Sequence, residues 1–340
     1  MENTVIKPRS VFQRAGFALL AFILAGEGLA VILTLLLTLA GALGLDVSIN
    51  DTLKLLVNYI PIYGIGFLVF WLVFHSVPKQ TIRKEKFSFG RLMAILLICY
   101  GMIYPLNIIG SLITSLFGGN LAGEAIMELT TMDSPFAFLI VVLAGPFVEE
   151  LIFRKLLLDR TVRCGEKTAI IFSALCFGLM HMNFTQFLYS FALGLVLGYV
   201  YCKSGKIHYT MILHMIINGI STLLSIAYVR AMKEMPALAN LDASSIGEIM
   251  EGSGSMNITF SGIIWMLIYI VLTLLILVFT VIGIIMLIKK ARYVRFDCSS
   301  PEFIPKGQVF KNVYLNAGVI IYVVLCGAMI IVSLFGLISI

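Results

Sequence analysis

Three short stretches of this sequence carry residue types that can transfer protons and stabilise negative charge. Together they supply two glutamates, an arginine, two histidines and an asparagine: Glu149, Glu150, Arg154, His181, His214 and Asn218. Carboxylates and imidazoles act as general bases and acids, while positively charged and amide N–H groups stabilise a developing oxyanion. No serine or cysteine lies at a fixed spacing from a base, so water is the natural nucleophile. The chemistry these residues favour is hydrolysis.

The spacing within these stretches places particular side chains together on a helix. Arg154 follows Glu150 by four residues, which puts both on one face within reach of an ion pair. Glu149 points about 100° away from Glu150, so the two glutamates cannot have the same role. Two neighbouring carboxylates in a low dielectric do not both ionise easily, and one is therefore expected to act as an acid or base. His214 and Asn218 share a helix face in the same way.

The composition identifies the elements that must hold these residues. The chain has 340 residues, of which 60% are hydrophobic and only 12% are charged, and its mean hydropathy is +1.03. An ordinary globular domain has about 25% charged residues. A soluble enzyme, a disordered protein and a disulfide scaffold are therefore excluded. Long unbroken apolar blocks, without alternation, exclude a β-barrel and predict an all-α polytopic bundle in the membrane.

About nine apolar segments have the character of membrane-spanning helices. We place them at residues 15–44, 56–77, 91–117, 135–158, 168–182, 186–202, 208–229, 258–288 and 313–339. A full span takes about 20 residues. The fifth and sixth segments are shorter than this, and we expect them to thin the bilayer locally or to lie beside a water-filled cavity inside the bundle.

The distribution of charge predicts the orientation of the bundle. With the N-terminus in the cytoplasm, 21 of the 24 Lys and Arg residues fall in cytoplasmic segments, as the positive-inside rule requires. The net charge of +6 is explained by this rule, and no nucleic-acid partner is expected. Three acidic residues lie within predicted spans, namely Glu27, Glu149 and Glu150. Charges within a membrane are costly and indicate function.

The predicted spans also divide the chain into regions. Residues 1–134 hold the first three helices, residues 135–229 hold four helices with all the candidate site residues, and residues 258–340 hold the last two. The longest connection, 230–257, is predicted to be a loop on the outer side. We expect an integral, multi-pass membrane protein, located in the plasma membrane if the organism is prokaryotic.

Three motifs in order resemble those of the CPBP intramembrane proteases. They are Glu149-Glu150-x-x-Phe153-Arg154, Phe177-x-x-x-His181 and His214-x-x-x-Asn218. That family groups CAAX prenyl endopeptidase II with bacteriocin-processing and bacteriocin-immunity proteins. The resemblance covers residues 140–222, about a quarter of the chain.

This resemblance implies an intramembrane endopeptidase with a cavity open to the cytoplasm, acting on a peptide precursor or a membrane-associated protein. It also implies a role for each motif residue. Glu149 is the general base that activates water, and His181 holds that water. His214 and Asn218 stabilise the oxyanion, while Glu150 and Arg154 orient the site. No cofactor is required.

Other interpretations remain open. A glutamate and two histidines also form the ligand set of several catalytic zinc sites, so Glu149, His181 and His214 are an alternative metal site. A non-catalytic immunity or adaptor protein that binds a peptide toxin or partner is the main rival to an enzyme. A proton-coupled transporter that uses Glu27, Glu149 and Glu150 is a weaker one, because no sequence repeat is visible.

Overall fold

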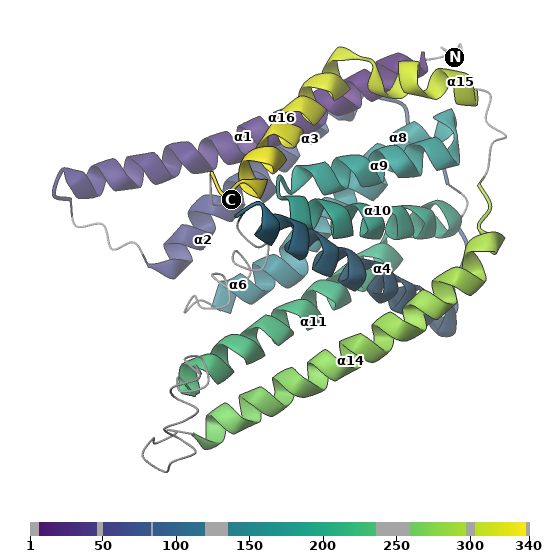
Figure 1. The fold of residues 1–340 in the computed structure, drawn as a ribbon. Coiled ribbons are helices and arrows are strands. Elements are labelled where there is room, and N and C mark those ends of the chain that lie inside the picture. Colours follow the sequence, from purple (N-terminus) through teal and green to yellow (C-terminus); the bar gives the residue numbers. More distant parts are fainter. Residues whose placement is uncertain are drawn as a thin grey trace.

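The structure, a computed structural model, describes residues 7–45, 50–82, 84–119, 135–235, 259–296 and 303–337. Within these ranges every regular element is helical (Figure 1). The first half of the chain contains α1 (Pro8–Ala42), α2 (Asp51–Ile60), η1 (Pro61–Gly66), α3 (Phe67–Phe74) and α4 (Phe89–Leu116). The centre contains α6 (Pro135–Leu139), η2 (Ile140–Ala144), α7 (Gly145–Glu150), η3 (Leu151–Leu158), α8 (Asp159–Thr161), η4 (Val162–Cys164) and α9 (Glu166–Met180). The remainder contains α10 (Phe184–Ser204), α11 (Ile207–Glu234), α14 (Phe260–Lys290), η5 (Ala291–Tyr293), α15 (Lys306–Val309), η6 (Phe310–Tyr314) and α16 (Ala317–Leu334).

The predicted all-α polytopic bundle is confirmed. In the described residues, eight helices are long and apolar enough to cross a membrane. The predicted fifth segment, 168–182, forms α9, which has 15 residues and is shorter than these eight. At about 1.5 Å per residue it spans about 22 Å, less than the hydrocarbon core of about 30 Å. Most of α9 is instead buried within the bundle, so nine segments give eight full-length helices.

Two predicted boundaries were wrong for local reasons. The last helix begins at Ala317 instead of 313, because the Asn316 side chain accepts the Val319 N–H at 3.0 Å and caps a new helix there. Helix α11 continues to Glu234, so the predicted outer loop 230–257 begins as helix. Residues 236–257 of that loop lie outside the described residues.

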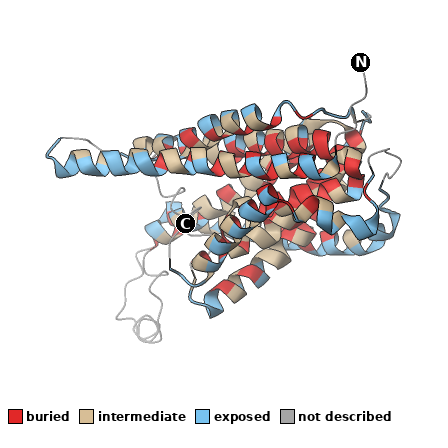
Figure 2. Ribbon diagram, turned by 90° about the horizontal axis from the view of Figure 1, so that it is seen from above, coloured by how far each residue is buried: buried red, intermediate tan, exposed pale blue. Residues whose placement is uncertain are grey.

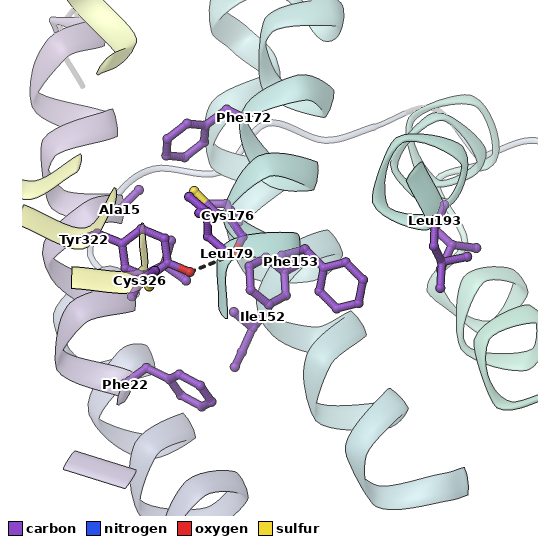
Figure 3. Close-up of a cluster of buried hydrophobic side chains, with 14 of the residues drawn as sticks. Ala15, Phe22, Ile152, Phe153, Phe172, Cys176, Leu179, Leu193, Tyr322 and Cys326 are labelled. Atoms are coloured by element: carbon purple, nitrogen blue, oxygen red, sulfur yellow. Dashed lines mark hydrogen bonds between the residues drawn. The ribbon is translucent and has the colours of Figure 1, made fainter. Parts of the chain in front are cut away.

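A buried apolar cluster joins the two ends of the chain to the centre (Figure 3). Phe12 of α1 packs edge-on against Phe172 of α9, with ring centroids 4.8 Å apart. On the other side, the Tyr322 hydroxyl of α16 donates a hydrogen bond of 2.7 Å to the Cys176 carbonyl. The cluster therefore fixes α9, whose end carries one of the predicted site residues.

The outer surface of the bundle is apolar. The first half of α1 is buried, whereas its second half is exposed over much of its length (Figure 2). Its exposed residues are leucines such as Leu35, Leu36 and Leu39. Large apolar side chains in contact with water would be unfavourable. This surface is what a helix facing lipid requires.

Helices α9 and α10 pack very closely through glycine. A Cβ at Gly194 would lie 2.8 Å from the Cα of Ala174, and one at Gly178 would lie 2.9 Å from the Phe187 carbonyl. Small residues at such contacts let two backbones approach in a membrane. The close approach sets the direction in which α9 ends.

Candidate active site

The glutamate-bearing helix is made of alternating π- and α-helical turns. The α-helical turn α7 lies between two π-helical segments, η2 and η3. At the first junction, the Gly145 N–H bonds to the Ile140 carbonyl, five residues back, and Pro146 has no N–H to donate. π-Helical turns within α-helices occur frequently at functional sites. Glu149 and Glu150 end the α-helical turn.

The proline at this junction explains one contact of Asn218. In a π-helix the Val141 carbonyl would accept from residue 146, but a proline occupies that position. The Asn218 side-chain nitrogen donates to this carbonyl instead, at 3.1 Å. One amide N–H therefore ties α11 to η2, while the second N–H is left for another acceptor.

Glu150 is the centre of a buried polar network. Its Oε2 lies 3.0 Å from Arg154 Nε, and both side chains are completely buried. Its Oε1 lies 3.1 Å from His214 Nδ1. Thr210, one turn before His214, lies near this carboxylate, while its hydroxyl donates to the Ile207 carbonyl at 2.9 Å. With an arginine and a histidine fixed on it, Glu150 has the surroundings of an ionised residue that positions its neighbours.

Glu149 has different partners. The hydroxyl of Tyr63, from η1, lies near its carboxylate. Its Oε2 lies 3.7 Å from His214 Nε2, which is longer than a hydrogen bond. The two glutamates thus have different partners, as their spacing predicted.

The position of His214 between the two glutamates constrains its protons. Because ionised Glu150 can only accept, His214 must present Nδ1–H to it. In a neutral imidazole, Nε2 then carries a lone pair, and it donates only when the ring is doubly protonated. Nε2 of His214 can therefore donate toward Glu149 only when the ring is doubly protonated.

His181 stands where α9 ends, at a strained turn. The next residue, Met182, has φ of +52°, in the left-handed region that non-glycine residues seldom adopt. Asn183 then caps α10 by accepting the Gln186 N–H. Such strain costs of order 1–3 kcal/mol and clusters at active sites. The Nε2 atom of His181 is buried and has no hydrogen-bond partner in the described part of the chain, which leaves it free for a ligand.

The ring of Phe177 brings the three motifs together. Its centroid lies 5.3 Å from that of His181 and 5.8 Å from that of His214. The Arg154 guanidinium carbon lies 5.1 Å from the same centroid. The six predicted residues thus gather from α7, η3, α11 and the end of α9. Glu27 is exposed on α1 and lies near Tyr63, but it is not among the residues gathered around Phe177.

Sequence reasoning missed two residues that contact the glutamates. Thr210 lies four residues before His214, and this spacing was a usable signal. Tyr63 gave no such signal, because it lies more than 80 residues before Glu149 in an apolar segment without polar spacing. Only the fold brings η1 to α7, where the Tyr63 oxygen occupies space that a Cβ at Gly145 would approach within 2.9 Å.

We expect Tyr63→Phe to lower kcat for hydrolysis about tenfold or more, while the protein remains folded. A hydrogen bond to a charged group contributes about 1.5–3 kcal/mol, and here it would fix the orientation of the Glu149 carboxylate. Steady-state kinetics on purified protein measures this effect. Tyr59→Phe is the matched control, because Tyr59 stacks on Tyr63 at 5.9 Å. Equal losses in the two variants would contradict the prediction.

The residues of the zinc alternative do not form a metal-binding arrangement here. Within the described ranges, no group of three or more His, Cys, Asp or Glu side chains is placed to hold a metal ion. His214 contacts one carboxylate with Nδ1 and faces the other with Nε2. Zinc binding through Glu149, His181 and His214 would therefore require these side chains to rearrange.

The chain is thus a polytopic helical bundle with a buried cluster of carboxylate and imidazole groups, which fits a membrane hydrolase. Comparison with known proteins agrees with this class. Residues 131–220 match the family model described as "Type II CAAX prenyl endopeptidase Rce1-like". This match includes all three motifs and confirms the resemblance to the CPBP family.

A curated relative supports the same class. The chain is 27% identical over 173 residues to a Bacillus subtilis (strain 168) protein named "Putative membrane peptidase YdiL". That alignment covers 48% of this chain and 69% of the relative. No solved structure matches the chain. The family match and the Bacillus subtilis relative together support the interpretation of this chain as a membrane peptidase.

Proposed function

We propose that this protein is a glutamate-dependent intramembrane endopeptidase that hydrolyses a peptide bond in a membrane-associated or precursor peptide. The observation that carries the proposal is the pairing of two buried glutamates with unequal partners around one histidine. Glu150 is held by Arg154 at 3.0 Å, whereas Glu149 faces His214 Nε2 at 3.7 Å. This division is what a base and its positioning residue require.

In the proposed reaction, Glu149 removes a proton from a water molecule as the water oxygen attacks the substrate carbonyl carbon. The buried and unpartnered Nε2 of His181 holds this water. The protonated Glu149 then donates its proton to the leaving amine nitrogen as the C–N bond breaks. Water is consumed, and the products are a carboxylic acid and an amine.

The negative charge that develops on the substrate carbonyl oxygen must be stabilised by hydrogen-bond donors. With Glu149 ionised and His214 doubly protonated, His214 Nε2–H points to the side of the cluster where Glu149 lies. The second N–H of Asn218 is a further donor, because only one is used on Val141. Each such donor contributes about 10²–10³-fold in kcat in other hydrolases.

Peptide cleavage by purified protein in detergent tests the proposal. A quenched fluorescent peptide library, with and without a prenyl group, is incubated with native protein and with His214→Ala. Cleavage by native protein alone supports the enzyme. If no peptide is cut and His214→Ala still replaces the native protein in cells, the non-catalytic immunity or adaptor hypothesis replaces the enzyme hypothesis.

We expect a strong chelator to leave the rate of cleavage unchanged. In the proposed reaction no step uses a metal, since Glu149 and His181 act on water directly. The measurement is the cleavage rate before and after chelation, followed by addition of zinc. Loss of activity on chelation, with recovery on adding zinc, would replace this mechanism by the zinc alternative.

A further inference from the structure

A cavity lies apart from the glutamate cluster. It has a volume of about 530 Å³, is partly open, and lies between α4, α9, α10 and α14. It lies at the end of the bundle where α4 and α9 begin and where α10 and α14 end (Figure 1). The six site residues do not line it. Along α9, its residue Ile171 is about 15 Å from His181.

The walls of this cavity are apolar. They include Ile95, Ile98, Ile171 and Leu195, and no acidic side chain is among the described residues that line it. A volume of this size lies in the range of ordinary ligand pockets. Water gains few hydrogen bonds in such a space. The walls therefore favour a hydrocarbon chain.

The cavity also has a basic mouth. Arg91, Lys167 and Lys290 are among its lining residues, and all three are exposed. The Arg91 guanidinium is held 3.6 Å from the centre of the Phe87 ring. The nearest acid along the chain, Glu166, is ion-paired with Lys203 at 2.7 Å. Among the described residues, three cations thus line the mouth and no carboxylate does.

From this combination we infer that the cavity binds an anionic phospholipid. The acyl chain occupies the apolar space, and the phosphate lies between Arg91, Lys167 and Lys290. Basic pockets between membrane helices bind anionic headgroups in this way. A free phosphate would leave the apolar walls unfilled, and a zwitterionic lipid would place an extra positive charge beside the three cations.

Lipid retention by the purified full-length protein tests this inference. The protein is reconstituted in nanodiscs of equal parts phosphatidylcholine and phosphatidylglycerol and is then analysed by native mass spectrometry. We expect retained phosphatidylglycerol in the native protein. Each basic residue near a headgroup is worth about fivefold in affinity. The triple change of Arg91, Lys167 and Lys290 to Gln should therefore lower retention about a hundredfold.

The matched control changes Lys7, Lys306 and Lys311 to Gln, which removes three exposed charges outside the cavity lining. Ala94→Trp fills the apolar space without changing charge and should also abolish retention. Thermal unfolding checks that each variant is folded. Equal retention of the two lipids, or equal loss in the control, would overturn the inference. Displacement of the lipid by a cleaved substrate peptide would also overturn it, because the cavity would then be a substrate site.

Discussion

Replacing Glu149 by glutamine is expected to reduce kcat for peptide hydrolysis about a thousandfold. General bases contribute about 10²–10⁴ to enzymatic rates. Glutamine keeps the shape of the side chain and can still contact Tyr63, but it cannot accept a proton from water. The chain should remain folded, because Glu149 is not part of the Arg154 ion pair. Single-turnover cleavage of a peptide identified from the library measures the loss.

The matched control for this change is Glu166→Gln. Glu166 is also buried, and its carboxylate also has a cationic partner, Lys203 at 2.7 Å, but it lies at the beginning of α9, away from His181. We expect this variant to retain most of the activity. Activity in Glu149→Gln comparable to that of the native protein would exclude Glu149 as the base and would favour a binding protein or a metal-dependent site.

The second large effect that we expect is a loss of thermal stability when Arg154 is replaced by methionine. Arg154→Met leaves Glu150 completely buried without its arginine. Breaking a buried pair from one side costs about 3–5 kcal/mol, because the remaining charge is uncompensated. The variant also removes the cation that lies 5.1 Å from the Phe177 ring centroid. Thermal unfolding in detergent should show a large decrease in Tm, accompanied by loss of cleavage.

Two comparison variants separate the charge effect from general damage. Lys155→Met, one residue further along the helix, removes an ion pair of 2.9 Å between a half-exposed lysine and the buried Asp159. Asp159 keeps the hydrogen bond of 2.7 Å from the Tyr201 hydroxyl, so this variant should lose less stability than Arg154→Met. The double variant Glu150→Gln with Arg154→Met removes both charges and should recover much of the lost stability. An unchanged Tm in Arg154→Met would contradict the buried-pair account.

The sequence by itself determined the helical membrane class and most of the residues of the site. Apolar blocks of the required length define spanning helices regardless of their neighbours, since lipid leaves no other way to satisfy the backbone. The i, i+4 spacing likewise predicted the Glu150–Arg154 pair, which forms at 3.0 Å. It also placed His214 and Asn218 on one face. These are local properties, which depend on helix geometry alone.

Tertiary structure decided the features that depend on which helices touch. The contact of Tyr63 with Glu149 joins segments far apart in the sequence and had no periodic signal. The position of His214 between two carboxylates follows from the packing of α11 against α7 and η3, and it determines which ring nitrogen must carry a proton. The orphan Val141 carbonyl, satisfied by Asn218, arises only where a π-helical turn meets Pro146. The spacing of residues in the sequence predicts which side chains form this site. Side chains from separate helices acquire their partners only when those helices pack together.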